Sequence, residues 1–249
     1  MQMESYYTLL EQLRTIANKC LTNHPEPKSE KEGLLLYAIA KADKTLCASS
    51  LLCRNGMGED ASILCRSIFE LALTIEYIFQ DPTDKMAKRY FSYDWIQRKK
   101  MYGYMARSGR FQKYLSSAES QKIITDINKE ANKVNKKYNY GSSWSDKNIA
   151  DMAKSVGWLD LYETAYRIQC NFSHSNPRSS NDYFKEENGR LILNSGPSEN
   201  LVSETLVTIF NSYFHIIRKI NDYFKKGLGA EIKKIEDDFV NLLKASNKS

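Results

Sequence analysis

Apolar residues recur three or four positions apart through most of this chain, which is the spacing of one face of an α-helix. Near the start the apolar face comprises Tyr6, Leu9, Leu10, Leu13, Ile16 and Ala17. Towards the end it comprises Leu201, Leu206, Phe210, Phe214, Ile217 and Ile220. Amphipathic segments of this kind bury one face against another helix. The pattern therefore predicts an all-α protein, a multi-helix bundle.

Residues typical of helix starts and stops divide the chain into segments. Ser29 with Glu32 and Ser116 with Glu119 have the spacing of a capping box, which opens a helix. The expected helices cover about residues 4–21, 30–54, 59–80, 82–106, a segment after 116, 149–156, 158–172, a long segment from 198, and 230–243. One stretch differs, because DYFKEE and RLILN flank Asn188-Gly189. This pattern predicts a small β-hairpin insertion near residues 183–193.

The totals favour one domain over residues 1–249, since 249 residues exceed a typical single domain but fall short of two. No secretory signal opens the sequence. Its most apolar window, residues 63–79, contains Arg66, Glu70 and Glu76, so we expect a buried helix and no membrane partner. The five cysteines are odd in number and form no C-x-x-C pair, which predicts reduced thiols and a cytoplasmic protein.

Positive charge is concentrated in one segment. Residues 85–138 contain 14 Lys and Arg against 4 Asp and Glu, a net +10, so the formal total of +6 leaves −4 elsewhere. This asymmetry predicts an anionic partner, with RNA as the candidate. The residues expected to follow phosphates or stack on bases are Arg98, Lys99, Lys100, Tyr102, Tyr104, Arg107 and Arg110. The alternative is a solvated cationic face over an aromatic core stripe.

Common catalytic and cofactor motifs are absent. The sequence has no G-x-x-x-x-G-K-[ST], no G-x-S-x-G and no H-E-x-x-H. A loose G-x-G-x-x-A at Gly56 follows no strand, so a tight turn explains it better than a dinucleotide site. The histidines His24, His174 and His215 fall in separate elements without metal-ligand spacing. We therefore expect neither a cofactor nor a metal.

Arg167 and His174 stand seven residues apart near the end of a predicted helix. At about 100° per residue this separation brings both side chains to nearly one face, roughly 10 Å apart along the axis. Arginine holds phosphoryl oxygens and histidine exchanges protons near neutral pH, so the pair fits metal-independent RNA cleavage. Tyr166 and Asn171 are candidate orienting residues. Alternatively, His174 interacts with free helix carbonyls and Arg167 pairs with Glu163.

Arg66 and Glu70 lie one helical turn apart within the apolar run ILCRSIFELALTIEYIF. Ionisable residues on so apolar a helix must be paired if they are buried. One interpretation is an internal salt bridge that fixes helix packing. The other is a polar cluster beneath the site of Arg167 and His174.

Two segments resemble a bacterial family of uncharacterised helical proteins, over roughly residues 33–185. The first is the L-x-R-S-x-x-E helix, here Leu64 to Glu70. The second is a Y-x-x-x-S-x-x-x-H ending, here Tyr166 to His174 with Cys170 in the serine place. That family is in turn similar to the HEPN superfamily, whose signature is an arginine followed several residues later by a histidine.

The resemblance implies a HEPN-like core of about residues 33–226, with an added N-terminal helix and a charged C-terminal helix. It also implies a homodimer and a metal-independent endoribonuclease of a toxin or phage-defence type, regulated by a protein partner or antitoxin. Arg167 and His174 would then be the catalytic pair. The second hypothesis is a non-catalytic helical module that binds nucleic acid or a protein partner, since a helical bundle does not by itself supply activity.

Overall fold

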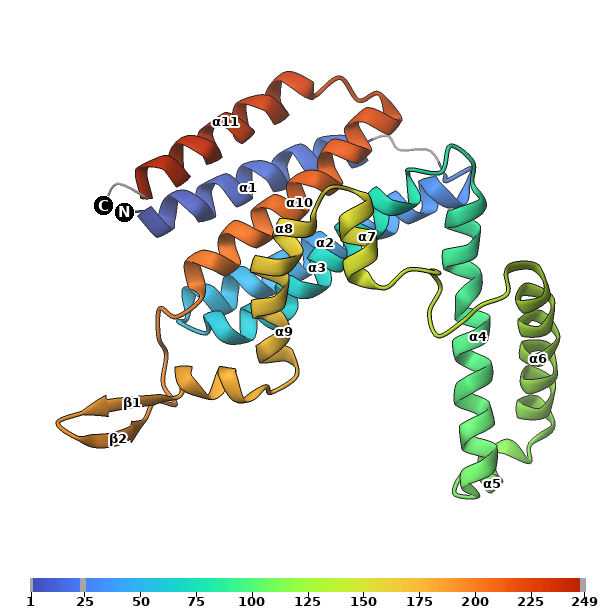
Figure 1. Ribbon diagram of the computed structural model, residues 1–249. Coiled ribbons are helices and arrows are strands. Elements are labelled where there is room, and N and C mark those ends of the chain that lie inside the picture. The colour runs from blue at the N-terminus through green and yellow to red at the C-terminus, as the bar shows by residue number, and fades with distance from the viewer. Residues whose placement is uncertain (1, 23–25, 247–249) are drawn as a thin grey trace. The chain divides into compact units, whose positions relative to one another are not determined.

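The protein is all-α, apart from one two-stranded hairpin, in a computed structural model that describes residues 2–22 and 26–246 (Figure 1). The predicted fold class is confirmed. Contacts between Cα atoms group the chain into two compact units. The first unit contains residues 1–28, 32–79 and 149–249, and the second contains residues 29–31 and 80–148. The expectation of one domain over residues 1–249 stays a prediction. His24 lies outside the described residues.

The first unit contains most of the helices. They are α1 (Gln2–Leu21), α2 (Glu30–Arg54), α3 (Gly58–Ile78), α7 (Ile149–Ser155), α8 (Leu159–Leu161), α9 (Arg167–Ser173), α10 (Val202–Phe224) and α11 (Gly229–Ser246). Helix α10 packs along α3, and α1 packs against both α10 and α11 (Figure 1). Gly58 permits the close approach beside α3, because a Cβ there would lie 2.1 Å from the carbonyl oxygen of Asn200.

A buried apolar core holds these helices together. Its largest fully buried side chains are Leu10, Leu13, Leu34, Leu35, Ile39, Leu46, Ile68, Leu73, Ile75, Ile78, Phe210 and Tyr213. The ring of Phe210 also stacks on Phe239 of α11 at 3.8 Å. Burying such side chains stabilises the fold by roughly 1.5–3 kcal/mol each. The helical periodicity in the sequence therefore identified residues that do form the core.

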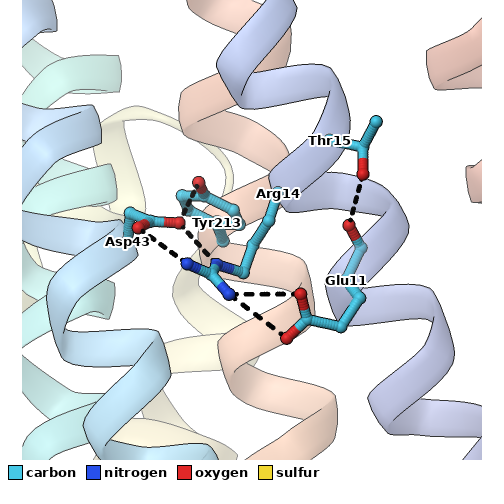
Figure 2. A network of polar contacts seen from close by, with 5 residues as sticks. All are labelled: Glu11, Arg14, Thr15, Asp43 and Tyr213. Carbon is cyan, nitrogen blue, oxygen red and sulfur yellow. Dashed lines mark hydrogen bonds and ion pairs between the residues drawn. The ribbon is translucent and has the colours of Figure 1, made fainter.

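A polar network crosses this core and joins α1, α2 and α10 (Figure 2). Arg14 donates from Nε to Asp43 Oδ1 at 2.8 Å and from Nη1 to Glu11 Oε2 at 3.1 Å. Tyr213 donates its hydroxyl to Asp43 Oδ1 at 3.1 Å. Burial raises the pKa of Tyr213, and the neighbouring Asp43 carboxylate raises it further. The tyrosine therefore stays protonated and acts as a donor that fixes the three helices together.

The second unit is a helical hairpin. It consists of α4 (Lys85–Ser108), α5 (Gln112–Leu115) and α6 (Ala118–Tyr138). Helix α4 packs on α6 through a small core of Tyr93, Ile96, Ala131, Val134 and Tyr138. Helix α4 ends at Gly109, whose φ of +68° is a left-handed conformation that glycine adopts without strain.

The β-hairpin pairs β1 (Phe184–Glu187) with β2 (Arg190–Leu193) in antiparallel register, Glu187 opposite Arg190. Asn188 and Gly189 have φ angles of +53° and +71°, as a two-residue turn of this kind requires. The hairpin expected near residues 183–193 is confirmed.

Several predicted helix boundaries were wrong, and hydrogen bonds near the helix starts explain two of them. Helix α4 begins at Lys85 and not at Pro82, because Asp81 accepts hydrogen bonds from the amides of Thr83 and Met86 and holds a turn there. Helix α10 begins at Val202 and not at Ser198, whose amide donates to the Gly56 carbonyl at 2.7 Å.

Two further helix predictions need correction. The cap of α6 is Ser117 and not Ser116: Ser117 is extended and its Oγ accepts from the Ser120 amide, whereas Ser116 is still helical at the end of α5. The segment from Trp158 to Phe172 is not one regular helix, because residues 162–166 form a single π-helical turn between α8 and α9.

Among the described residues, no helix has both the length and the apolar character that crossing a bilayer requires. All five cysteines are free thiols. Burial raises the pKa of Cys53 to about 12 and that of Cys20 to about 11, so both thiols stay protonated and unreactive near neutral pH.

Candidate functional site

The candidate site lies in the first unit, where α9 packs against α3. Arg66 and Glu70 stand one turn apart on α3. The π-helical turn Tyr162–Tyr166 leads into α9, which ends at Ser173 with His174 as its C-terminal cap. π-helical turns are uncommon and occur frequently at functional sites. The Tyr166 ring is buried, 5.2 Å from the ring of Phe69 on α3, and this contact holds the turn on α3.

Five side chains meet here, and we refer to Arg66, Glu70, Tyr166, Ser173 and His174 as the Arg66 cluster. Arg66 Nε donates to Glu70 Oε1 at 2.9 Å and to the Tyr166 hydroxyl at 3.3 Å. Its Nη1 donates to Ser173 Oγ at 2.6 Å and lies 2.9 Å from His174 Nε2. The Tyr166 hydroxyl donates to Glu70 Oε1 at 2.7 Å. One guanidinium thus connects α3 to the end of α9.

The hydrogen bonds assign protons within the cluster. Arginine only donates, so His174 Nε2 accepts from Arg66 and the imidazole is the neutral tautomer with its proton on Nδ1. Burial raises the pKa of Tyr166, and its hydrogen bond to Glu70 raises it further, so the phenol stays protonated. Burial lowers the pKa of Arg66, but Tyr166 and Glu70 raise it by more, and the guanidinium stays charged.

The Arg66 cluster is open to solvent on one side. The Arg66 side chain is 22% exposed and His174 is exposed. Among the described residues, nothing accepts a hydrogen bond from Nη2 of Arg66, so this nitrogen is available to an anionic ligand. A hollow of about 400 Å³ adjoins the end of α9, and its lining includes Phe172, Ser175 and Tyr183. No side chain of the Arg66 cluster lines this hollow, so the site itself combines a charged donor and a neutral imidazole at a partly exposed helix end.

The structure brings only some of the predicted catalytic residues together. Tyr166 and His174 belong to the Arg66 cluster, whereas Arg167 Nη1 bonds Glu163 Oε2 at 2.7 Å and is 64% exposed. The ion pair between Arg167 and Glu163, expected if Arg167 is not catalytic, is therefore present. The backbone carbonyl of Asn171 accepts from the Asn176 amide, and its side chain makes no hydrogen bond within the described part of the chain. The arginine beside His174 is Arg66.

The interpretations made from the sequence paired Arg66 with Glu70, or placed both beneath a site of Arg167 and His174, but Arg167 lies outside the Arg66 cluster. Arg66 and Glu70 form an internal salt bridge, and Arg66 also reaches His174. Ser173 was not singled out by sequence reasoning, although its position directly before His174 at a helix end was a usable signal.

The residues predicted to bind RNA lie in the second unit, on α4 and in the turn after it. Some are tied to neighbours: Arg98 Nε donates to Asp94 at 2.6 Å and Lys99 Nζ to Asn132 at 2.7 Å. Lys100 lies 5.7 Å from the centre of the Tyr93 ring. These contacts hold each of the three cationic side chains against a neighbour, and as consecutive helical residues the three point in different directions, about 100° apart.

The remaining predicted residues differ in their exposure. Tyr104 is 61% exposed. Arg107 and Arg110 form no ion pair within residues 80–148, all of which are described. Tyr102, Lys99, Lys100 and Arg107 line a groove of about 560 Å³ between α4 and α6. A cationic groove with an aromatic side chain suits a single-stranded nucleic acid.

Within residues 2–22 and 26–246, no three His, Cys, Asp or Glu side chains gather as a metal site would require. The Arg66 cluster itself contains one carboxylate and one imidazole.

Comparison with known proteins gives a family but no activity. No curated protein matches the sequence. No solved structure matches it either. The model of a family of unknown function, DUF5677, matches residues 32–191, which include both halves of the Arg66 cluster. Since the match covers more than half of the 249 residues, the chain belongs to this family.

Proposed function

We propose that this chain is a metal-independent, HEPN-like endoribonuclease in which Arg66 holds the scissile phosphate and His174 accepts a proton. The observation that carries the proposal is the 2.9 Å contact between Arg66 Nη1 and His174 Nε2. It places a permanent positive charge beside a neutral imidazole at an exposed helix end. Arg66 replaces Arg167 in the role that sequence spacing suggested.

The chemistry follows from these two groups. A phosphate oxygen accepts from Arg66 and displaces His174 Nε2, which is then free to take the proton of the ribose 2′-hydroxyl. The 2′-oxygen bonds to phosphorus, the bond to the 5′-oxygen breaks, and that oxygen takes a proton from water. The products are a 2′,3′-cyclic phosphate and a 5′-hydroxyl. Arg66 stabilises the charge that develops on the phosphorus oxygens.

The cationic groove of the second unit supports an RNA substrate. Lys99, Lys100 and Arg107 contribute charge, and Tyr102 contributes a stacking surface. As part of the proposal, the protein acts in the cytoplasm as a homodimer of toxin or phage-defence type and is held inactive by a protein partner such as an antitoxin. These features come from the resemblance of its motifs to HEPN proteins.

A second candidate is a non-catalytic helical module that binds nucleic acid or a protein partner. The observation that favours it is the number of protein groups already bonded to Arg66: Glu70, Tyr166, Ser173 and His174. In that case the Arg66 cluster only holds α9 on α3.

Cleavage separates the two candidates. Wild type, His174→Ala, Arg66→Lys and Arg167→Ala would be incubated with total RNA and labelled oligonucleotides in EDTA, with circular dichroism on each protein. We expect cyclic phosphate ends from wild type and Arg167→Ala, and a loss of about 10²- to 10⁴-fold in His174→Ala. Arg66→Lys keeps the charge but loses the planar fork, so its rate should also fall.

Three outcomes decide between the assignments. Equal rates in wild type and His174→Ala would contradict the catalytic role of His174. A loss confined to Arg167→Ala would restore the assignment made from sequence spacing. No cleavage by any of the folded proteins would favour the binding module.

A further inference from the structure

A second cavity in the first unit is lined by residues of α3, of the segment 158–165 and of α10, and by no residue of the Arg66 cluster. Its volume is about 190 Å³, and its lining includes Phe69 of α3, Trp158, Ala165, and Asn211, Ser212 and His215 of α10. Apart from His215, none of the residues that line it carries a charge near neutral pH. This cavity takes no part in the cleavage chemistry proposed above.

Aromatic rings form much of its wall. The rings of Phe69 and Trp158 are 5.9 Å apart, and those of Trp158 and His215 are 4.5 Å apart. Flat apolar surfaces of this kind favour a flat ligand, since ring stacking adds about 0.5–1.5 kcal/mol beyond the burial of area.

His215 is neutral at this wall. Burial, together with the nearby charges of Arg218 and Lys219, lowers its pKa to about 4. Its Nδ1 lies 3.4 Å from Arg218 Nη2, which can only donate, so Nδ1 accepts and the proton sits on Nε2. Within the described residues, neither that N–H nor the indole N–H of Trp158 has a hydrogen-bond acceptor.

Acceptors are present as well. Asn211 donates its amide nitrogen to the Val207 carbonyl at 3.1 Å, which leaves its side-chain oxygen without a described partner. Ser212 is 2% exposed, and its hydroxyl makes no hydrogen bond to any described residue. Trp158, Asn211 and His215 are half-buried, so these groups give the cavity wall both donors and acceptors that a ligand can reach.

Size and charge define that ligand. A cavity of about 150 Å³ can hold benzene, so 190 Å³ accommodates one ring or a compact pair of rings. Burying a charge without a partner is costly. We propose that this cavity binds a neutral, planar heteroaromatic ring of nucleobase size, such as adenine, either as a free small molecule or as one base of an RNA strand.

Titration calorimetry on the full chain tests the proposal with adenine, and with indole and adenosine 5′-monophosphate for comparison. We expect adenine to bind with one-to-one stoichiometry and more tightly than the charged nucleotide. Ala165→Phe fills the cavity and should abolish binding. Asn211→Ala removes one acceptor and should weaken adenine about tenfold while leaving indole unchanged. Asn18→Ala, on the exposed face of α1, serves as the matched control.

Absence of binding by the wild type, or adenine binding that persists undiminished in both cavity variants, would overturn the proposal. If Ala165→Phe fails to fold by circular dichroism, Asn211→Ala decides. Displacement of adenine by a single-stranded oligonucleotide would identify the base of an RNA as the source, and no displacement a free ligand. RNA cleavage is not measured, so a negative result here leaves the proposed function standing.

Discussion

At the scale of single residues, Arg66 connects parts of the chain that are distant in sequence. Its partner Ser173 lies 107 positions later, at the end of α9. Each hydrogen bond to a charged group contributes about 1.5–3 kcal/mol to stability, whereas an exposed ion pair contributes little. Arg66 and Arg167 therefore differ in what they stabilise, although both are arginines paired to a glutamate one helical turn away.

Arg66→Ala should lower the free energy of unfolding by about 2 kcal/mol, because it leaves Glu70 and Ser173 without their charged donor. Arg167→Ala should leave the urea midpoint of unfolding unchanged, since its guanidinium is largely exposed. Urea unfolding followed by circular dichroism measures both. Equal destabilisation by the two variants would show that the Arg66 cluster does not hold α9 in place.

Sequence spacing placed Tyr166 and His174 near each other but paired His174 with Arg167, whereas its arginine neighbour in the structure is Arg66. The spacing of Arg167 and His174 predicts that they share a face of one helix, and it says nothing about an arginine on another helix. Arg66 reaches His174 only because α3 and α9 pack together, which depends on long-range contacts. Arg167 has a local partner in Glu163, four residues earlier, and that pairing was visible in the sequence.

His215 should make stability depend on pH. Its folded pKa is about 4 and its ordinary value is 6.5, so between these values the unfolded chain binds a proton that the folded chain does not. Acidification from pH 6.5 to 4 therefore lowers stability, by up to about 3 kcal/mol from this group. Arg218 and Lys219 oppose its protonation, while Glu236 and the Glu76 carboxylate, 3.9 Å from Nδ1, favour it.

The test compares urea unfolding of wild type and His215→Gln at pH 7, 5.5 and 4.5. The other titrating groups are common to both proteins and cancel in the difference. We expect the stability of the wild type relative to His215→Gln to decrease steadily with acidification. A difference that stays constant with pH would show that the pKa of His215 is the same in the folded and the unfolded chain.

At the scale of helices and strands, periodicity predicted which segments are helical, while local capping decided where they begin. The apolar faces of α1 and α10 and the Asn188-Gly189 hairpin turn were readable because each depends on neighbours in sequence. The start of α10 was not readable, because the Ser198 amide bonds the distant Gly56 carbonyl. The π-helical turn before α9 also has no simple sequence signature.

Ser117→Ala should destabilise the second unit by about 1 kcal/mol, because its hydroxyl accepts the Ser120 amide at the start of α6. Ser116→Ala is a matched control, since the neighbouring Ser116 hydroxyl is exposed and bonds only the Lys113 carbonyl. Hydrogen exchange of amides in α6 reports on this unit directly. Faster exchange in Ser116→Ala than in Ser117→Ala would show that α6 is capped by Ser116, the residue expected from sequence.

At the scale of the whole molecule, charge is divided between the units. Residues 85–138 carry a net +10, and the rest of the chain carries −4. The Arg66 cluster lies in the unit with the negative balance, and the cationic groove lies in the other. The proposed function therefore predicts that binding of RNA and chemistry on RNA are separable by substitution.

Arg107→Ala should weaken binding of single-stranded RNA and reduce the slope of log affinity against log salt by about 0.7, the contribution of one phosphate contact. Fluorescence anisotropy at several salt concentrations measures this slope. Lys234→Ala on α11 controls for total charge, because it removes the same charge from outside the groove. Equal slopes for the two variants would contradict RNA binding in the groove between α4 and α6.

The packing of α1 has a consequence for synthesis of the chain on the ribosome. Helix α1 ends at Leu21, but it packs on α10 and α11, which begin at Val202 and Gly229. The hydroxyl of Tyr6 is hydrogen-bonded to that of Ser246 at 3.3 Å, and Lys19 forms an ion pair with Glu231. Helix α1 must therefore wait for α10 and α11, with the face that packs on them uncovered in the meantime. A ribosome that stalls before α10 would present that face to chaperones and proteases.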